Sequence, residues 1–383
     1  MSEAFVRFVR ELYAEPEAFI PLHAPVMGAL EKARVGEAID SSFVSSVGAF
    51  VTAFEQRVAD FTGARFAVAT VNGTAALHAA LVVAGVEPGD LVLTQSLSFI
   101  ATCNAIHYCG AEPVFVDVDE DTLGLSPQAL GAWLEEHAER RGGQAYERSS
   151  GRRLCACVPM HTLGHPARIE AIAEVCAAWG IELVEDAAES LGSVRGGRHT
   201  GTFGRLGAFS FNGNKVITTG GGGMIVTDDE VLARRAKHLT TTAKKPHPWA
   251  FEHDEVGFNY RLPNLNAAFG VAQMERLPGL LESKRKVAEA YAHWCAEHGG
   301  SFVAEPAGTH SNYWLNALRL RDETARDAFL AATNQAGVMT RPLWTPMHHL
   351  PMYATCRCGP LPVTEHLAAT IVNIPSSALP EAA

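Results

Sequence analysis

The sequence has 383 residues, 47% of them hydrophobic, and its 31 Lys and Arg against 42 Asp and Glu give a formal net charge of -11. This length predicts one large domain with a smaller one packed on it. The acidic charge, with no Lys/Arg cluster, argues against a nucleic-acid partner. The sequence also lacks a signal peptide and an apolar run of membrane-spanning length, so we expect a cytoplasmic protein.

The first predicted elements alternate between helix and strand. Apolar residues spaced by three and four from Val47 to Phe61 predict a helix that ends at Gly63. A strand over 66–71 then breaks at Asn72-Gly73 into an alanine-rich helix, TAALHAALVVAG. The alternation continues with a strand at 91–94, a helix at 100–108, a strand at 113–118 and a helix at 127–137. This order predicts an α/β fold with a mostly parallel sheet covered by helices on both faces.

Residues 139–153 are polar and glycine-bearing, and we expect a surface excursion there. Strands at 154–160 and 181–186 then flank a helix at 169–180, and two further apolar runs lie at 206–211 and 222–228. We expect the large domain, including an N-terminal arm, to occupy residues 1–275. A smaller α+β domain would occupy 276–383, with a long helix over Pro278–Glu297, a strand over Tyr313–Leu320 and a helix over Glu323–Ala336.

The eight cysteines do not predict a metal site or a disulfide framework. Neither Cys155/Cys157 nor Cys356/Cys358 has the C-x2-C spacing of a zinc site. We interpret them as buried or incidental thiols and expect no bound metal.

Three segments place chemically useful residues at the carboxyl ends of predicted strands. Asn72-Gly73-Thr74 opens a helix, where glycine allows close backbone approach and free N–H groups suit a phosphate. Asp186 follows an apolar strand, where a carboxylate can keep a pyridine nitrogen protonated. Lys215 precedes Gly220 to Gly223, and such a lysine can form an imine with a carbonyl. Each has an ordinary alternative: a turn that binds nothing, a helix-capping aspartate or a solvated lysine.

Together these segments resemble the sugar-nucleotide aminotransferases of the DegT/DnrJ type, the fold type I enzymes that use pyridoxal 5'-phosphate. The resemblance lies in Asn72-Gly73-Thr74, in Ser98-Phe99-Ile100-Ala101-Thr102, in Glu185-Asp186-Ala187-Ala188, in Ser210-Phe211 with Lys215, and in Thr218-Thr219-Gly220. It extends over nearly the whole chain. It implies a fold type I transferase and a catalytic Lys215.

The resemblance also implies roles for single residues. Gly73, Thr74 and Ser210 would bind the cofactor phosphate, Phe99 would stack on the pyridine ring, and Asp186 would pair with the ring nitrogen. Glu189 stands where many relatives have a glutamine near the cofactor's 3-hydroxyl group. Asn259, in GFNYRLPNLNAA, would reach the partner subunit's cofactor phosphate in a homodimer with shared active sites; the alternative is an ordinary helix-start asparagine.

Several segments resemble the branch that aminates C4 of a UDP- or GDP-linked 4-keto-6-deoxy sugar, including the 2-acetamido sugars on routes to legionaminic acid and bacillosamine. By this analogy glutamate would be the amino donor. Four residues would line the sugar-nucleotide cleft, with packing roles as the alternative: His161, Arg261, Trp344 and His348.

Two other functions fit the same fold. One is a sugar dehydratase, although such relatives carry histidine where this chain has Lys215. The other is a regulatory protein without catalysis, against which the intact lysine, aspartate and phosphate turn argue.

Overall fold

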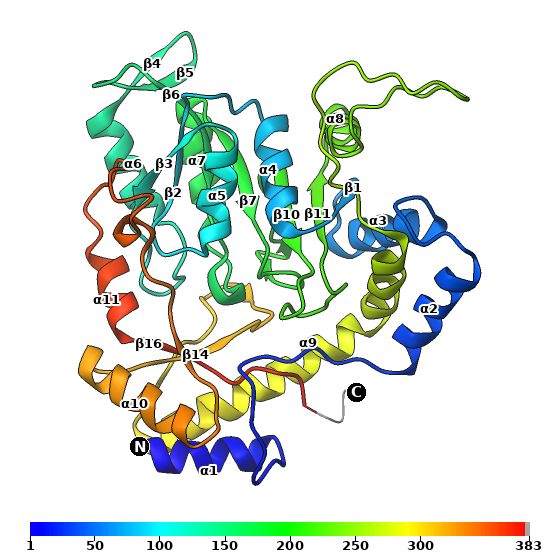
Figure 1. The fold of residues 1–383 in the computed structure, drawn as a ribbon. Coiled ribbons are helices and arrows are strands. Elements are labelled where there is room, and N and C mark those ends of the chain that lie inside the picture. Colours follow the sequence, from blue (N-terminus) through cyan, green and yellow to red (C-terminus); the bar gives the residue numbers. More distant parts are fainter. Residues whose placement is uncertain (380–383) are drawn as a thin grey trace.

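The computed structural model describes residues 1–379, which form a large sheet with flanking helices and a smaller sheet beneath it (Figure 1). Seven strands of the large sheet lie in the order β1, β11, β10, β7, β6, β2, β3. Their bounds are Phe66–Thr70, Gly223–Thr227, Leu206–Ser210, Glu182–Asp186, Arg153–Val158, Leu91–Gln95 and Glu112–Val116. Of these seven, only β11 runs antiparallel to its neighbours. The predicted mostly parallel sheet is confirmed.

Helices cover both faces of this sheet because successive strand side chains alternate between two apolar clusters. Val92 packs with α4 (Gly73–Val83), α5 (Ile100–Tyr108) and α8 (Glu230–Thr240). Its neighbours Leu91 and Leu93 instead pack with α6 (Pro127–His137) and α7 (Ile169–Trp179). This period of two is the strand pattern, and it fixes which helices share a layer.

The polar stretch after α6 is not a simple surface excursion. It forms a hairpin of β4 (Ala138–Arg141) and β5 (Gln144–Glu147), and β5 pairs with β6. Gly142 and Gly143 connect the strands with φ of 57° and 86°. Two successive positive φ angles suit a two-residue hairpin turn, so the Gly-Gly pair was the signal for these strands.

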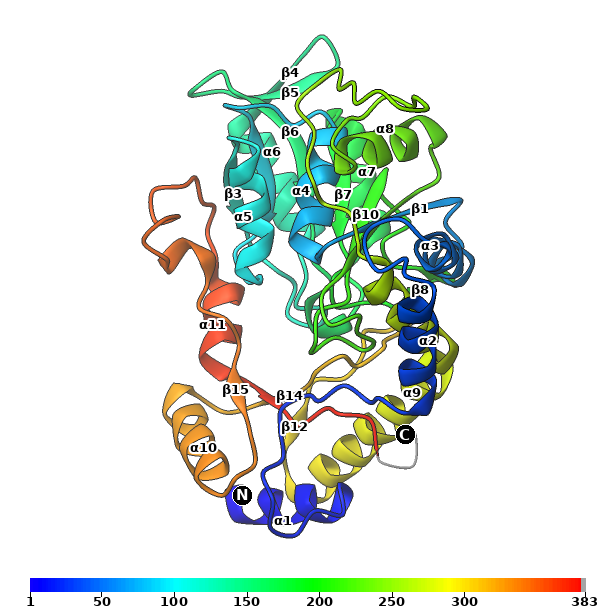
Figure 2. The ribbon, with the colours of Figure 1, turned by 45° about the vertical axis from the view of Figure 1, so that its right-hand side comes forward.

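The smaller sheet is antiparallel, in the order β12 (Ser301–Phe302), β14 (Asn316–Arg319), β16 (Ile371–Ile374), β15 (Arg341–Pro342). The N-terminal helix α1 (Ser2–Leu12) packs here rather than on the large sheet (Figure 2). Its Phe5 is fully buried, with ring contacts to Tyr291 and Phe329. Chain ends far apart in sequence therefore share one core.

A 35-residue helix, α9 (Asn264–His298), joins the two sheets and crosses residue 275 without a break. The predicted start at Pro278 is wrong, because this proline lies inside the helix. A proline there removes one backbone hydrogen bond, but packing of the preceding turns against α3 (Ala49–Thr62) and α2 (Ala29–Asp40) compensates. The division into domains near residue 275 stays a prediction.

The remaining elements are short or peripheral. They comprise α10 (Glu323–Gln335), α11 (Pro362–Thr370), the 3-10 helices η1 (Thr162–Gly164) and η2 (Met347–His349), and a three-stranded sheet of β13 (Thr309–His310), β8 (Val194–Arg195) and β9 (Arg198–His199). None of the helices described in residues 1–379 combines the length and apolarity that crossing a bilayer requires.

Candidate active site

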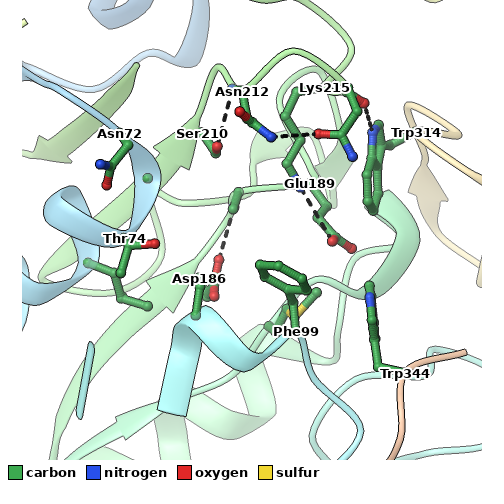
Figure 3. A pocket seen from close by; sticks show the side chains of 16 residues that line it. Asn72, Thr74, Phe99, Asp186, Glu189, Ser210, Asn212, Lys215, Trp314 and Trp344 are labelled. Carbon is green, nitrogen blue, oxygen red and sulfur yellow. Dashed lines mark hydrogen bonds and ion pairs between the residues drawn. The ribbon is translucent and has the colours of Figure 1, made fainter. Parts of the chain in front are cut away.

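A cavity of about 340 Å³ opens at the carboxyl ends of β1, β2, β7 and β10 (Figure 3). Because these strands run in the same direction, the segments that follow them meet at one edge of the sheet. The lining residues are Asn72, Gly73, Thr74, Leu77, Phe99, Ala101, Met160, Asp186, Ala188, Glu189, Ser210, Asn212, Asn214, Lys215, Trp314 and Trp344. The structure thus brings together the three segments that the sequence singled out.

The first turn of α4 forms one side of the cavity. Asn72 caps this helix, and its Oδ1 accepts a hydrogen bond of 2.8 Å from the Ala75 N–H. The N–H groups of Gly73 and Thr74 have no intrahelical acceptor because they lie at the helix start. A Cβ atom at Gly73 would lie 2.7 Å from the Ser210 Cβ, so only glycine lets the turn approach β10 this closely. The N–H groups of the helix N-terminus and the Ser210 hydroxyl group are together suited to binding a phosphate.

Asp186 ends β7 and is almost completely buried beside the cavity. Its Oδ2 accepts a hydrogen bond of 2.6 Å from the Thr102 hydroxyl, and its Oδ1 accepts one of 3.1 Å from the Ala188 N–H. The second bond closes a turn rather than capping a helix, since residues 187–192 are not helical. Two donors stabilise a negative charge at the position predicted for the ring-nitrogen partner.

Lys215 lies between an acid and an aromatic ring. Its Nζ is 3.4 Å from Glu189 Oε1 and 3.9 Å from the centre of the Trp314 ring. The Lys215 N–H donates to the Asn212 carbonyl in the turn after β10. The side chain is only 12% exposed, so it is directed into the cavity rather than into solvent.

Glu189 is fully enclosed, and burial raises its pKa to about 7. The positive charge of Lys215 and the Leu163 N–H, which donates to Oε2 at 2.9 Å, act in the opposite direction. Near neutral pH this carboxyl group therefore holds a proton in part of the molecules. The Lys215 amine has a proton acceptor or donor beside it.

Two aromatic side chains form the opposite wall. Phe99, the N-cap residue of α5, is 47% exposed. Trp344 meets it edge-on with ring centres 6.2 Å apart. A large ring left uncovered inside a cavity is suited to stacking on a planar ligand.

Two predicted substrate residues do not reach this cavity. His161 is fully buried; its Nδ1 accepts the Ala167 N–H at 3.1 Å, so its Nε2 carries the proton and lies 2.9 Å from Glu185 Oε2. His348 lies between Ser96 Oγ at 2.7 Å and Glu365 Oε1 at 2.8 Å. Both histidines have partners of their own.

Asn259 and Arg261 also lie outside the cavity. Asn259 is exposed, and its Oδ1 accepts a hydrogen bond of 3.0 Å from Arg261 Nε. The main chain between them pairs with the end of β1, where the Val71 N–H donates to the Tyr260 carbonyl. Trp344 is therefore the one of the four predicted substrate residues that lines the cavity.

The sequence interpretation missed Asn212, Asn214 and Trp314 as lining residues. The two asparagines are in the same loop as Lys215, so their proximity was a usable signal. Trp314 had no local signal, because it lies in the segment that leads into β14 of the smaller sheet and reaches Lys215 only through the tertiary fold.

The side chains present fit pyridoxal 5'-phosphate. A helix N-terminus with a serine faces the phosphate position, Phe99 offers a stacking surface, Asp186 provides a buried carboxylate, and Lys215 provides the amine. When bound, this cofactor supplies an aldehyde for imine formation and an electron sink.

Comparison with known proteins agrees with this site. Residues 25–381 match the model of the DegT/DnrJ/EryC1/StrS aminotransferase family. EpsN of Bacillus subtilis, whose name describes a pyridoxal phosphate-dependent aminotransferase, is 39% identical over 335 residues, 87% of this chain and 84% of that protein. GDP-perosamine synthase of Caulobacter vibrioides is 36% identical over 365 residues, 94% and 93% of the two chains.

Among solved structures, DesI in the presence of its TDP-sugar product is similar with a TM-score of 0.82 at 29% identity, over 97% of this chain and 91% of that chain. The predicted fold type I architecture is confirmed by this likeness. The match to the family model covers nearly the whole sequence. The chain is therefore a pyridoxal phosphate-dependent aminotransferase of the DegT/DnrJ/EryC1/StrS family.

Proposed function

We propose that this enzyme transfers an amino group from glutamate to the C4 ketone of a UDP- or GDP-linked 4-keto-6-deoxy sugar. The observation that carries the proposal is the convergence of Lys215, Asp186, Phe99 and the α4 N-terminus in one cavity. Similarity to GDP-perosamine synthase and to the TDP-sugar-bound DesI supports a nucleotide-linked sugar as acceptor.

The residues of the cavity have distinct tasks in this reaction. Gly73, Thr74 and Ser210 would hold the cofactor phosphate, and Asp186 would keep the ring nitrogen positively charged. Lys215 would hold the cofactor through its amine and, when that amine is free, would donate or accept the proton that is transferred at sugar C4. Glu189, 3.4 Å from the Lys215 Nζ, exchanges a proton with that amine. Trp344, which lines the cavity beside Phe99, would contact the sugar.

We also propose a homodimer in which Asn259 of each subunit completes the partner's phosphate site. In support, Asn259 is exposed and does not line the cavity of its own chain. The adjoining segment 241–256 extends beyond α8 (Figure 1) and carries exposed Trp249, Phe251 and Val256 at 81%, 81% and 88%. Exposed apolar side chains concentrated in one segment are typical of an interaction surface.

The test is a side-by-side assay of UDP- and GDP-linked 4-keto-6-deoxy sugars, with and without a 2-acetamido group, in the presence of glutamate. We expect a 4-amino sugar and 2-oxoglutarate in equal amounts, and no turnover by Lys215→Ala. Loss of the C3 hydroxyl group without amination would instead identify a dehydratase. Turnover by Lys215→Ala without an added amine would contradict the role of this lysine.

A further inference from the structure

Lys284 is an ionisable side chain buried where the proposed mechanism does not use it. It lies in the middle of α9 and is 1% exposed. Its Nζ donates to the Trp314 carbonyl at 3.1 Å and to the Ser376 carbonyl at 2.5 Å. Within residues 1–379 no carboxylate lies within ion-pair distance of this amine. Burial lowers the pKa of Lys284 to about 7.

An apolar residue would fill this space without the cost of desolvating an ammonium group. A buried amine without a carboxylate partner therefore points to a task that its two hydrogen bonds perform. One bond holds the C-terminal segment. The other holds the residue whose ring contacts Lys215.

Trp314 has a partner for each of its polar groups. Its N–H donates to Asn312 Oδ1 at 2.8 Å, and its indole Nε1–H donates to the Asn214 carbonyl at 2.6 Å, next to Lys215. Asn312 in turn donates to the Glu189 carbonyl at 2.8 Å. The remaining polar group of Trp314, its carbonyl, accepts the hydrogen bond from Lys284. Trp314 is thus fixed to both loops that carry the amine and its neighbouring acid.

The same lysine connects these loops to the two chain ends. The Ser376 N–H donates to the Leu22 carbonyl at 2.7 Å. His23 follows, with a buried Nδ1 that has no hydrogen-bond partner among residues 1–379. Burial and then the positive charges of Lys284 and Lys215 lower the pKa of His23.

We propose that Lys284 is a positioning residue that holds Trp314 against Lys215 and so sets the orientation of the reactive amine. This inference rests on the proposed function, in which Lys215 is the amine that binds the cofactor. A ring 3.9 Å from Nζ restricts the lysine on one side, and Glu189 restricts it on the other. A displacement of Trp314 by a fraction of an ångström changes both contacts, and misplacement on this scale slows reactions at an enzyme site.

The chain offers a matched control on the same helix face. Tyr291 lies two turns further along α9 and donates from its hydroxyl group to the Pro375 carbonyl at 2.9 Å. Tyr291→Phe therefore removes an anchor of the same C-terminal segment without touching Trp314. Lys284→Met removes both the anchor and the bond to Trp314, with little change in volume.

The holoenzymes of both variants are compared with the wild type by kcat, by KM, by thermal unfolding and by circular dichroism of the bound cofactor's visible band. We expect Lys284→Met to lower kcat roughly tenfold with KM changed much less, and to weaken the dichroic band. Tyr291→Phe should change only the unfolding temperature. Lys284→Gln, which keeps an N–H donor, should lie between wild type and Lys284→Met, and it replaces Lys284→Met if that variant does not fold.

The inference is overturned if Lys284→Met, or Lys284→Gln in its place, resembles Tyr291→Phe, with lower stability but a wild-type kcat and dichroic band. A separate measurement checks the assumption beneath it. Borohydride treatment of the wild type should attach the cofactor to the peptide that contains Lys215. Attachment elsewhere refutes the proposed function itself, whereas attachment at Lys215 leaves the Lys284 comparison to decide this inference alone.

Discussion

Two buried carboxyl groups, Asp186 and Glu189, face the same cavity in different surroundings. Asp186 accepts hydrogen bonds from a hydroxyl group and a backbone N–H, which stabilise its negative charge. Glu189 is enclosed, and burial raises its pKa to about 7. Asp186 is thus held as a hydrogen-bond acceptor beside the cavity, whereas Glu189 is suited to exchanging a proton with Lys215.

Asp186→Asn should lower kcat by roughly 100-fold or more while weakening cofactor binding much less. The amide keeps the shape of the side chain and its bond with Thr102, but loses the negative charge that would keep the cofactor's ring nitrogen protonated. Steady-state kinetics and equilibrium dialysis of the cofactor measure the two effects. A rate near that of the wild type would mean that Asp186 only closes the turn to Ala188.

Glu189→Gln should change how stability depends on pH. The folded-state pKa of about 7 exceeds the unfolded value of about 4.3, so the folded protein binds the extra proton between these values. This stability is fully present below pH ~4.3 and is lost as pH rises through 7, on the order of 4 kcal/mol. The free energy of unfolding, measured by urea denaturation, should therefore fall more steeply between pH 5 and 8 for the wild type than for the variant. Parallel curves for the two proteins would contradict the raised pKa.

At the scale of elements, the site depends on glycines that let backbone segments touch. Gly73 opens α4 against β10, and Gly223 opens β11 where a Cβ atom would lie 2.3 Å from the Asn72 carbonyl oxygen. The strand that follows the lysine loop therefore packs directly beside the turn that faces the phosphate position. The glycine-rich sequence is required by this close approach rather than by flexibility.

Gly73→Ala should weaken cofactor binding at least about tenfold and destabilise the fold by roughly 1–3 kcal/mol, because its Cβ meets Ser210 in the sheet. The control is Gly36→Ala in α2, where nothing lies within 4 Å of an added Cβ. That variant should be unchanged or slightly more stable, since alanine favours helix. Equilibrium dialysis of the cofactor measures binding, and thermal unfolding measures stability, for each of the two variants. Equal behaviour of the two variants would show that the tight turn is not needed.

At the scale of the whole molecule, the arrangement of Asn259 predicts that active sites are shared between two subunits. The residue follows the lysine loop in sequence, yet it lies outside the cavity of its own chain. A two-fold interface would place this segment at both sites reciprocally. The exposed segment 241–256 leads directly into it.

Mixing Lys215→Ala subunits with Asn259→Ala subunits should restore activity. In hybrid dimers one site carries both lesions and the other carries neither, so output should approach half that of a wild-type dimer. Activity should rise in proportion to the hybrid fraction measured by native mass spectrometry. Hybrids no more active than a nearly inactive Asn259→Ala parent would show that the asparagine serves its own subunit.

The sequence by itself determined the order of elements in the large sheet and the local chemistry at strand ends. The spacing of apolar residues along a helix or strand reflects which of its faces is buried. This spacing can be read from a short stretch of sequence. The Asn72-Gly73 turn, Asp186 and Lys215 were predictable because each follows a recognisable strand. In a parallel sheet all such ends meet at one edge, so their convergence followed from the element order.

The tertiary structure alone decided what depends on contacts between distant segments. Pro278 is inside α9 because the turns before it pack on α2 and α3, and α1 joins the smaller sheet through Phe5. His161 is engaged by Glu185, and Trp314 reaches Lys215 from another sheet. A histidine or a tryptophan has the same local pattern in a core as in a site. Only the three-dimensional neighbours, brought together by burial of apolar surface, determine which role it has.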